Sequence, residues 1–399
     1  MANVSSSNGI GKRPKLRFSG FDNSYFESTL GDIFEYERPD KYIVSSEKYH
    51  NEYSIPVLTA NQAFILGYTN ETEGIYDKGP VILFDDFTCD MKYADFPFKV
   101  KSSAMKLLTS KSGTPIFYAY SLLQHINYQP EGHARHWISI MQPITVMMPD
   151  IAEQKKISDF LMLVNARIEK QQELIETLKE YKRGVSMRFF DEILNDQTCA
   201  AKQFSEIFEL IQNNTFSREC LTDESTDVLN VHYGDILVKY GSVLDPDIDA
   251  VPFIKSETDV SKFSGSSYLQ DGDVIFADTA EDYTVGKMCE IINVSNRKIL
   301  SGLHTMPFRP TIAFTPMYLG YYLNSSAFRA QILPIIQGVK VSSISKSEMK
   351  KTIIYIPSID RQKEIVSILN ALDNRIKRNE LIMAELKEMK KGLLQNLFI

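Results

Sequence analysis

The chain is poor in cysteine. Only four cysteines occur among its 399 residues, and Cys89, Cys199, Cys220 and Cys289 lie far apart. That spacing argues against a zinc knuckle or a disulfide framework and suits a reducing compartment. No apolar run approaches the ~20 residues that a membrane span needs, and the opening MANVSSSNGIGKRPK lacks the apolar core of a signal peptide. We therefore expect a soluble, cytoplasmic protein with no membrane partner.

Motifs for catalysis are missing as well. Gly9, Gly11 and Lys12 lie in an N-terminal tail with no strand before them, so they do not make a phosphate loop. No glycine-rich cofactor loop is followed by an Asn-Pro-Pro-aromatic motif, which argues against a self-contained DNA methylase. His133 and His136 are a single pair of possible metal ligands, without a second pair at a usable spacing. The sequence predicts a non-catalytic chain that itself binds no cofactor or metal.

Acidic residues are scarce in two stretches, although the chain as a whole carries a formal net charge of −7. None occurs from Ile291 to Ser347, and Glu131 is the only one from Phe96 to Pro149. Each half of the chain thus has an acidic front and a basic back. A local basic face can bind phosphates on an acidic protein, because screening limits distant charges to about 8–10 Å of reach. Alternatively, these stretches are buried strands with few charges of any kind.

Two stretches repeat each other without gaps at an offset of 208 residues (357 − 149). The first begins PDIAEQKKI at Pro149, and the second begins PSIDRQKEI at Pro357. The residues of the first copy that recur in the second are Pro149, Ile151, Gln154, Lys155, Ile157, Leu161, Arg167, Ile168, Leu178, Lys179, Glu180, Lys182 and Gly184. An internal repeat determines architecture before any local pattern does. We expect two similar halves, each closed by one helix.

Each copy predicts a long helix that begins after its proline. Asp150 is the expected N-cap, with Glu153 completing a capping box, and Ser358 is the corresponding cap. Apolar residues then follow a heptad that places Gln171 and Asn379 at matching core positions, a pattern that fixes coiled-coil register. The rods should measure roughly 55–60 Å at 1.5 Å per residue. The chain permits a parallel pair, but we favour the antiparallel one, which relates the halves by a pseudo-two-fold axis.

Asp150, Glu153 and Lys155 superficially match the acidic-acidic-lysine set of metal-dependent nucleases. The three residues fall within one helical turn, and the second copy has Arg361 in place of Glu153. Helix capping therefore explains them better than catalysis does.

The rest of each half predicts a mixed α/β globule with mostly antiparallel strands, so the fold class is α+β. Short helices are expected at Thr29–Tyr36 and Gln203–Leu210. Strands are expected at Ile55–Leu58, Val81–Phe84, Ile236–Val238, Val274–Phe276 and Ile353–Ile356. The predicted boundaries are a flexible tail at 1–14, globules at 15–148 and 196–356, and spacer helices at 149–195 and 357–399.

Cationic and hydroxyl side chains, which donate to phosphate oxygens and reach base edges, alternate in both basic stretches. These DNA-binding candidates are Lys99, Lys101, Ser102, Ser103 and Lys106, then Lys340, Ser342, Ser343 and Lys346. His133, Arg135 and His136 adjoin Trp137, the one tryptophan, in a possible base-contacting loop. Tyr240, Tyr283 and His304 are weaker candidates. Solvated loops and, for Trp137, a core position are the alternatives.

Taken together, these motifs resemble the specificity subunits of type I restriction–modification systems. The resemblance covers almost the whole chain. It rests on the two proline-started helices, which end in LKEYKRG and LKEMKKG, and on the globule segments LGDIFEY, GPVILFDDF, FPFKVKSSA, GDVIFADTAEDYTVGK and SGLHTMPFRP. Arg361 is a departure, since a glutamate usually precedes the helix glutamine in this family.

The resemblance implies a DNA-binding, non-catalytic subunit with two target-recognition domains, each reading one half of a split duplex sequence. The spacer helices would set the unread gap and dock two methyltransferase subunits, which use S-adenosylmethionine to methylate adenine. Two restriction subunits, which use ATP and Mg, would join through them, in a complex that serves phage defence. A coiled-coil scaffold with two protein-binding domains and no DNA readout is the alternative from another class.

Overall fold

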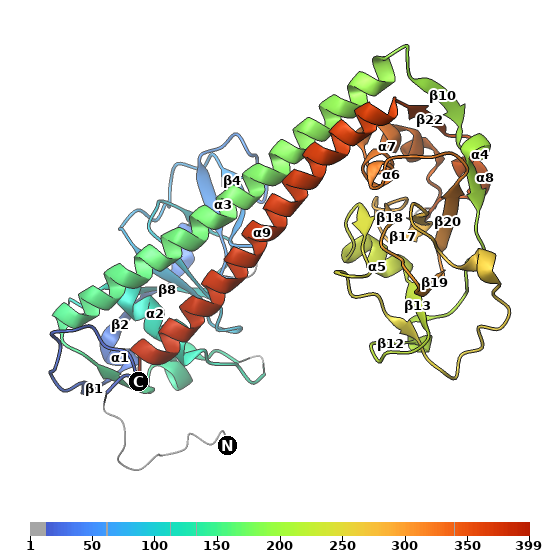
Figure 1. The fold of residues 1–399 in the computed structure, drawn as a ribbon. Helices are drawn as coiled ribbons and strands as arrows, with labels where there is room; N and C mark the ends of the chain where they lie inside the picture. The colour runs from blue at the N-terminus through green and yellow to red at the C-terminus, as the bar shows by residue number, and fades with distance from the viewer. Residues whose placement is uncertain (1–12, 61–62, 112, 133, 339) are drawn as a thin grey trace. The chain divides into compact units, whose positions relative to one another are not determined.

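The computed structural model describes residues 13–60, 63–111, 113–132, 134–338 and 340–399 (Figure 1). Residues 1–12 of the predicted flexible tail therefore lie outside the described residues, as does His133. The chain divides into two compact units, which we call the first unit, Met1–Glu173 with Glu380–Ile399, and the second unit, Leu174–Asn379. Each unit thus takes part of both long helices.

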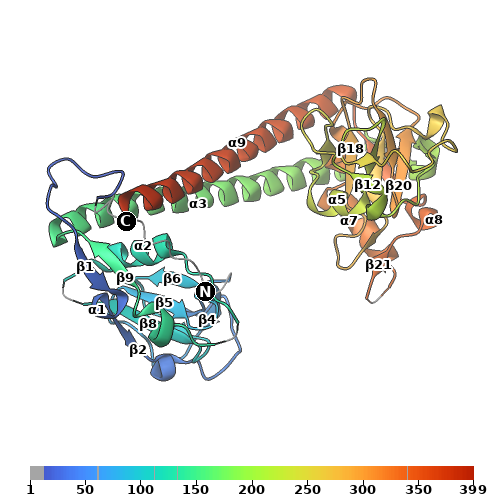
Figure 2. The same ribbon diagram turned by 90° about the horizontal axis from the view of Figure 1, so that it is seen from below.

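The first unit is built from two small sheets and a strand pair (Figure 2). The larger sheet has the order β2-β8-β5-β6 and is antiparallel, whereas β3 in the smaller sheet pairs antiparallel with β4 and parallel with β7. The elements are β1 (Phe26–Thr29), α1 (Leu30–Ile33), β2 (Phe34–Glu37), β3 (Ile55–Leu58), β4 (Ile65–Thr69), β5 (Val81–Asp85), β6 (Met91–Ala94), β7 (Lys99–Val100), β8 (Met105–Ser110), α2 (Ile116–Ile126) and β9 (Thr145–Met148).

The second unit repeats this plan with short additions. Its larger sheet runs β11-β20-β16-β18-β14, and its smaller sheet β12-β15-β13-β19. The elements before the acid-free stretch are β10 (Ala200–Gln203), α4 (Phe204–Ile207), β11 (Phe208–Leu210), β12 (Leu221–Thr222), β13 (Val228–Val231), α5 (Tyr233–Val238), β14 (Val243–Leu244), β15 (Phe253–Ile254), β16 (Val274–Ala277), β17 (Thr279–Ala280) and β18 (Met288–Ile291). The elements that follow β18 are β19 (Lys298–Ser301), β20 (Thr305–Pro310), α6 (Tyr318–Tyr322), α7 (Ser326–Ile332), β21 (Ser342–Ser343), α8 (Lys346–Met349) and β22 (Ile353–Ile356).

The strand registers match individual positions of the two units. Phe84 on β5 lies opposite Lys106 on β8, and Phe276 on β16 lies opposite Met306 on β20. On the other side of β20 lies β11, where Leu210 pairs with Phe308. In the first unit Tyr36 on β2 pairs with Leu108 on β8 in the same way. We therefore treat Phe84 and Phe276 as matched, which also matches the residues two positions on, Asp86 and Asp278.

The long helices α3 (Ile151–Asn195) and α9 (Ile359–Leu397) pack antiparallel within each unit (Figure 1). In the first unit, Ile157 near the start of α3 shares a core with Leu394 near the end of α9. In the second unit, Phe190 near the end of α3 shares a core with Ile365 near the start of α9. Most predicted heptad positions are buried or half-buried, as an apolar seam requires. The predicted fold class, including the antiparallel helix packing, is confirmed.

Trp137 lies in one of the two hydrophobic clusters of the first unit. Its ring is fully buried and packs edge-on against Phe34 and Phe84, with centroid distances of 5.6 and 5.0 Å. Of the two alternatives for this residue, the core position is therefore the one that the structure shows.

Three predicted elements differ from the structure. The helices expected at Thr29–Tyr36 and Gln203–Leu210 are the single turns α1 and α4, each between two strands. The strand expected at Ile236–Val238 is wrong, because these residues complete the helix α5. His232 caps this helix by accepting a hydrogen bond from the backbone N–H of Gly234 at 3.1 Å, and three apolar residues show no period that separates strand from helix.

Candidate nucleic-acid interface

Asp86 organises the end of the central strand in the first unit. Its carboxylate accepts hydrogen bonds from the backbone N–H groups of His136 and Trp137 at 3.2 and 2.8 Å. The other carboxylate oxygen lies 3.1 Å from the ammonium group of Lys106. The backbone of Asp86 forms two more hydrogen bonds. Its N–H donates to the Ala104 carbonyl, and its carbonyl accepts from the His136 N–H. The side chain is 3% exposed, so these bonds are protected from water.

Asp278 occupies the matched position in the second unit. Its N–H donates to the carbonyl of His304 at 3.1 Å, and its carbonyl accepts from Ile344 N–H at 2.9 Å. These two backbone bonds correspond to those of Asp86, so Ala104 is matched by His304 and His136 by Ile344. The side chain of Asp278, however, is 24% exposed.

Because these backbone bonds match, the loop before His136 and the loop before Ile344 occupy equivalent positions in the two units. Arg135, one residue before His136, corresponds to Ser343, one residue before Ile344. The offset between these residues is 208 (343 − 135), which is also the offset of the helices. The sequence comparison detected the repeat only from Pro149 onward, because the loops share position but almost no residues.

The second unit brings four predicted candidates together. Ser342 and Ser343 form β21, which pairs with Ala280 and Thr279 of β17. His304 lies beside this pair, with its Nδ1 atom 3.4 Å from the Thr279 hydroxyl. Tyr283, in the loop after β17, has a side chain that is 81% exposed. Lys340 is also exposed, two residues before the ladder, and Lys346 is half-buried after it.

Some predicted candidates are turned inward. Lys99 is buried, where its ammonium donates to the Glu73 carbonyl at 2.6 Å and lies 3.0 Å from the Glu71 carboxylate. Lys106 is buried against Asp86, as described above. In this structure these two ammonium groups are committed to carboxylates and do not face a phosphate, which corrects the expectation that they line an exposed basic loop.

His136 and Tyr240 are buried too. His136 is 1% exposed, with its Nδ1 atom 3.2 Å from the Asp86 carbonyl. The Tyr240 hydroxyl donates to the Ala250 carbonyl at 3.3 Å, and burial raises the pKa of this phenol. Their rings therefore lie inside the units and not at the surface.

The remaining candidates of the first unit lie at the surface. Arg135 is exposed, with its guanidinium 5.7 Å from the ring centroid of Phe87. Ser103 is exposed and Ser102 is half-buried, next to the Ala104 carbonyl that binds Asp86. Lys101 donates to the Glu47 carboxylate.

Ion pairs across each unit neutralise much of the two basic stretches. In the second unit Arg297 pairs with Asp247 at 2.6 Å, and Arg309 with Asp273 at 2.7 Å. The guanidinium of Arg309 also lowers the cost of burying Asp273, although burial still raises the pKa of that carboxyl. Much of the cationic charge in these stretches is therefore paired, whereas Arg135 and Lys340 are exposed.

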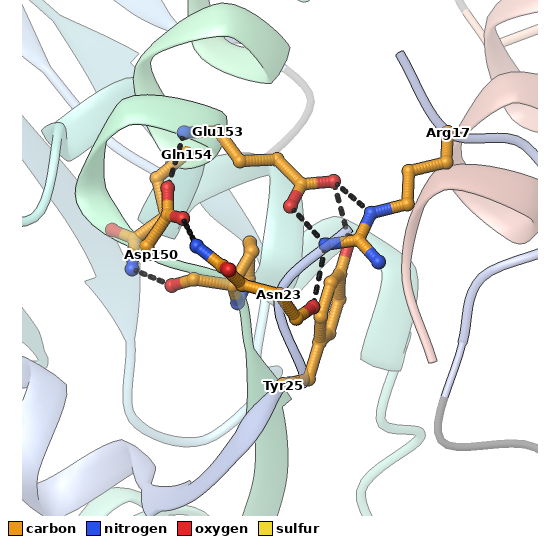
Figure 3. A network of polar contacts seen from close by, with 7 residues as sticks. Arg17, Asn23, Tyr25, Asp150, Glu153 and Gln154 are labelled. Carbon is orange, nitrogen blue, oxygen red and sulfur yellow. Dashed lines mark hydrogen bonds and ion pairs between the residues drawn. The ribbon is translucent and has the colours of Figure 1, made fainter. Parts of the chain in front are cut away.

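The start of α3 is held by a network of polar contacts (Figure 3). Asp150 caps α3 by accepting from the Glu153 N–H at 2.9 Å, and it also accepts from Asn23 at 2.8 Å. The Glu153 side chain does not bind back to the cap, so the predicted capping box is only half formed. Instead it accepts two bonds from Arg17, at 2.9 and 2.8 Å, and one from the Tyr25 hydroxyl at 3.1 Å.

The second helix keeps the cap but not the carboxylate. Ser358 accepts from the Arg361 N–H at 3.3 Å, and Arg361 itself pairs with Glu192 and Glu364, both at 2.6 Å. The glutamine that follows holds its proline carbonyl in both copies, at 2.8 Å from Gln154 and 3.0 Å from Gln362.

Gln171 and Asn379 fall on opposite sides of the division between the units. Gln171 is 5% exposed, and the Asn379 amide donates to the Arg375 carbonyl of its own helix at 2.7 Å. Their pairing across the helices stays a prediction.

The sequence reasoning missed Asp86, Asp278 and Tyr233. The ring of Tyr233 packs edge-on against His304 at 5.3 Å. A signal for both aspartates was available, because each directly follows an apolar strand, in VILFDD and VIFAD.

Over the ranges that the structure describes, no three His, Cys, Asp or Glu side chains come close enough to hold a metal ion. The same residues contain no helix that is both long and apolar enough to cross a membrane.

The family profile described as "Type I restriction modification DNA specificity domain" matches residues 24–180 and 199–388. The specificity subunit of the Escherichia coli type I restriction enzymes EcoR124I and EcoR124II is 49% identical over 133 residues, 31% of this chain and 33% of that protein. The putative MjaX specificity subunit of Methanocaldococcus jannaschii is 26% identical over 205 residues, 49% of this chain and 44% of that protein. The chain thus spans less than half the length of either relative.

Solved structures agree on the fold. A type I restriction–modification S subunit from M. genitalium superposes with a TM-score of 0.59 at 14% identity, covering 97% of this chain and 99% of that one. A structure reported for complex assembly and conformational transition of a type I system gives 0.52 at 13% identity, with 94% and 98% covered.

Proposed function

Because the chain belongs to the type I restriction–modification DNA specificity family, we propose that it is the DNA-recognition subunit of such a complex. Each unit reads one half of a bipartite duplex target with the loops around Asp86 and Asp278. The paired helices α3 and α9 set the length of the unread gap between the two halves. The chain contributes no catalysis of its own.

One observation carries this proposal. The units share strand order and backbone bonds, but their side chains differ at matched positions. Ala104 of the first unit corresponds to His304 of the second, and Arg135 corresponds to Ser343. A scaffold that holds two like partners would keep those side chains alike. A bipartite reader needs two similar mounts with different reading surfaces.

The partners are two methyltransferase subunits, which bring S-adenosylmethionine, and two restriction subunits, which bring ATP and Mg and attach through the methyltransferase. Docking on the long helices would cover apolar side chains that they expose. Leu163 and Tyr181 on α3 are 71% and 60% exposed, and Leu381 on α9 is 66% exposed.

Sequencing the methylated adenines in cells that express the chain with its methyltransferase partner tests the proposal. We expect methylation only within a bipartite sequence with a fixed unread gap. Binding of the purified complex to random duplexes should also weaken as salt rises, because phosphate contacts release counterions. A flat dependence of log K on log[salt], with no bipartite methylation, would favour the scaffold alternative.

The spacer role makes a geometric prediction. Adding one heptad to each helix, after Gln171 and after Asn379, lengthens the rods by about 10 Å, or roughly three base pairs. The unread gap should grow by that amount while both half-sites stay the same, as the methylation pattern would show. Altered half-sites, or an unchanged gap in a folded variant, would contradict the ruler.

A further inference from the structure

Asp278 lies among exposed polar side chains at the interface of the second unit, and we infer that it reads a cytosine in the half-site of that unit. The inference rests on the proposed function, since it assigns one base contact within the DNA interface. It comes from the contrast with Asp86, whose backbone has the same two bonds but whose side chain has other partners.

The Asp86 carboxylate is fully occupied. One oxygen accepts from two backbone N–H groups, and the other faces the Lys106 ammonium. In the second unit Met306 takes the place of Lys106, so no cation lies behind Asp278 at that position. The Asp278 carboxylate is correspondingly eight times more exposed, at 24% against 3%.

One oxygen of Asp278 remains available. Oδ1 accepts from the Thr279 hydroxyl at 2.8 Å and lies 3.4 Å from Nδ1 of His304. No residue that the structure describes donates a hydrogen bond to Oδ2. The side chain therefore presents a free acceptor at the surface, next to Thr279 and the β21 serines.

The backbone holds this acceptor in place. The bonds from Asp278 N–H to His304 and from Ile344 N–H to Asp278 fix the residue on both sides, and His304 packs against Tyr233. A reading group needs such support to stay within reach of one base edge. An ionised carboxylate cannot bind phosphate, but it accepts a hydrogen bond from the N4 amino group of cytosine in the major groove.

The test compares Asp278→Asn with the wild-type chain, each in complex with the methyltransferase partner, on duplexes randomised over both half-sites. We expect the wild-type complex to prefer C·G at one position of one half-site. The variant should lose that preference by roughly 5- to 100-fold and gain A·T there, since asparagine pairs with adenine. Every other position should keep its preference.

Two variants separate readout from charge and from folding. Asp282→Asn removes the same charge from the exposed loop that follows β17, and it should shift binding to all sequences together. Thr279→Val removes the hydroxyl that donates to Oδ1 but keeps the acceptor, so the C·G preference should persist. Its loss in folded T279V would assign the readout to Thr279 and overturn the inference.

Two results distinguish the role of Asp278 from the proposed function of the chain. An Asp278→Asn complex with wild-type preferences at every position would overturn the role of Asp278 and leave the proposed function standing. A wild-type complex without any bipartite preference would overturn both.

Discussion

The starts of α3 and α9 have similar sequences and a side-chain cap at the same position, Asp150 in one and Ser358 in the other. Only the start of α3 binds a distant segment through a buried carboxylate. Glu153 has a side chain 1% exposed and binds Arg17, which is 14% exposed. Arg361, at the matched position, makes ion pairs whose members are 29–53% exposed. Both copies therefore keep the cap and the glutamine that begin the helix. The charge at the position of Glu153 and Arg361 differs in sign because the two residues have different surroundings.

Replacing Glu153 by alanine should break this comparison with the largest effect. Removing one partner of a buried pair leaves the Arg17 charge and the Tyr25 hydroxyl uncompensated, which costs about 3–5 kcal/mol of unfolding free energy. Arg361→Ala should cost less than about 1 kcal/mol, because exposed pairs contribute little. Urea unfolding of both variants measures the difference, and equal losses would contradict the contrast between the two helix starts.

A second contrast lies on β6 and β18, the strands that pair antiparallel with β5 and β16. By the same register, Tyr93 on β6 matches Glu290 on β18. Tyr93 packs its ring against Phe117 of α2 at 5.1 Å. Glu290 instead accepts backbone bonds from Met317 and Gly320 at the start of α6, at 2.7 and 2.8 Å. Burial raises the pKa of this carboxyl to about 7, although the three N–H groups that point at it favour the charged form.

This contrast predicts a pH dependence. Between pH 4.5 and 7 the unfolded chain releases the Glu290 proton while the folded chain keeps it, so stability falls as pH rises through this window. Relative to Glu290→Gln, the wild-type protein should lose about 3 kcal/mol at most between pH 4.5 and pH 8. Thermal or urea unfolding at a series of pH values tests this difference.

Tyr93→Phe is the matched control for that series. Burial raises the pKa of the Tyr93 phenol above its usual value near 10, so this group stays neutral throughout the window. The difference between wild type and Tyr93→Phe should therefore be independent of pH. A Glu290→Gln difference that is equally flat would show that the carboxyl keeps an ordinary pKa in the folded protein.

The sequence predicted what depends on periodicity and missed what depends on distant partners. The heptads and the antiparallel packing could be predicted because the apolar pattern extends along helices of 45 and 39 residues. The caps could be predicted because each depends on residues three positions apart. Strands such as β3 and β22 were found at their true bounds, since turn residues enclose them. The burial of Lys99 and Lys106 could not be predicted, because it depends on Glu71 and Asp86, which only the folded sheets bring near.

In the candidate loops too, residue types could be predicted from the sequence, whereas contacts between distant residues could not. Lys340 and Arg135 were recognised by residue type alone, and both are exposed at the matched loops. The equivalence of these loops needed the bonds from Asp86 and Asp278, which join residues 50 or more positions apart. The two loops share these backbone bonds but not their side chains, so no sequence pattern records the match.

The smallest expected effect sharpens the comparison of these two loops. Lys340→Ala and Arg135→Ala should each weaken DNA binding broadly and lower the salt slope by about one, if each cation binds one phosphate. Lys202, exposed on β10 beside the helix ends, is the control whose removal should leave the slope unchanged (Figure 1). Filter binding of the complex at several salt concentrations gives the slopes. If one variant instead relaxes preference at a single base pair, that side chain reads sequence, and the two units divide positioning and readout differently between matched loops.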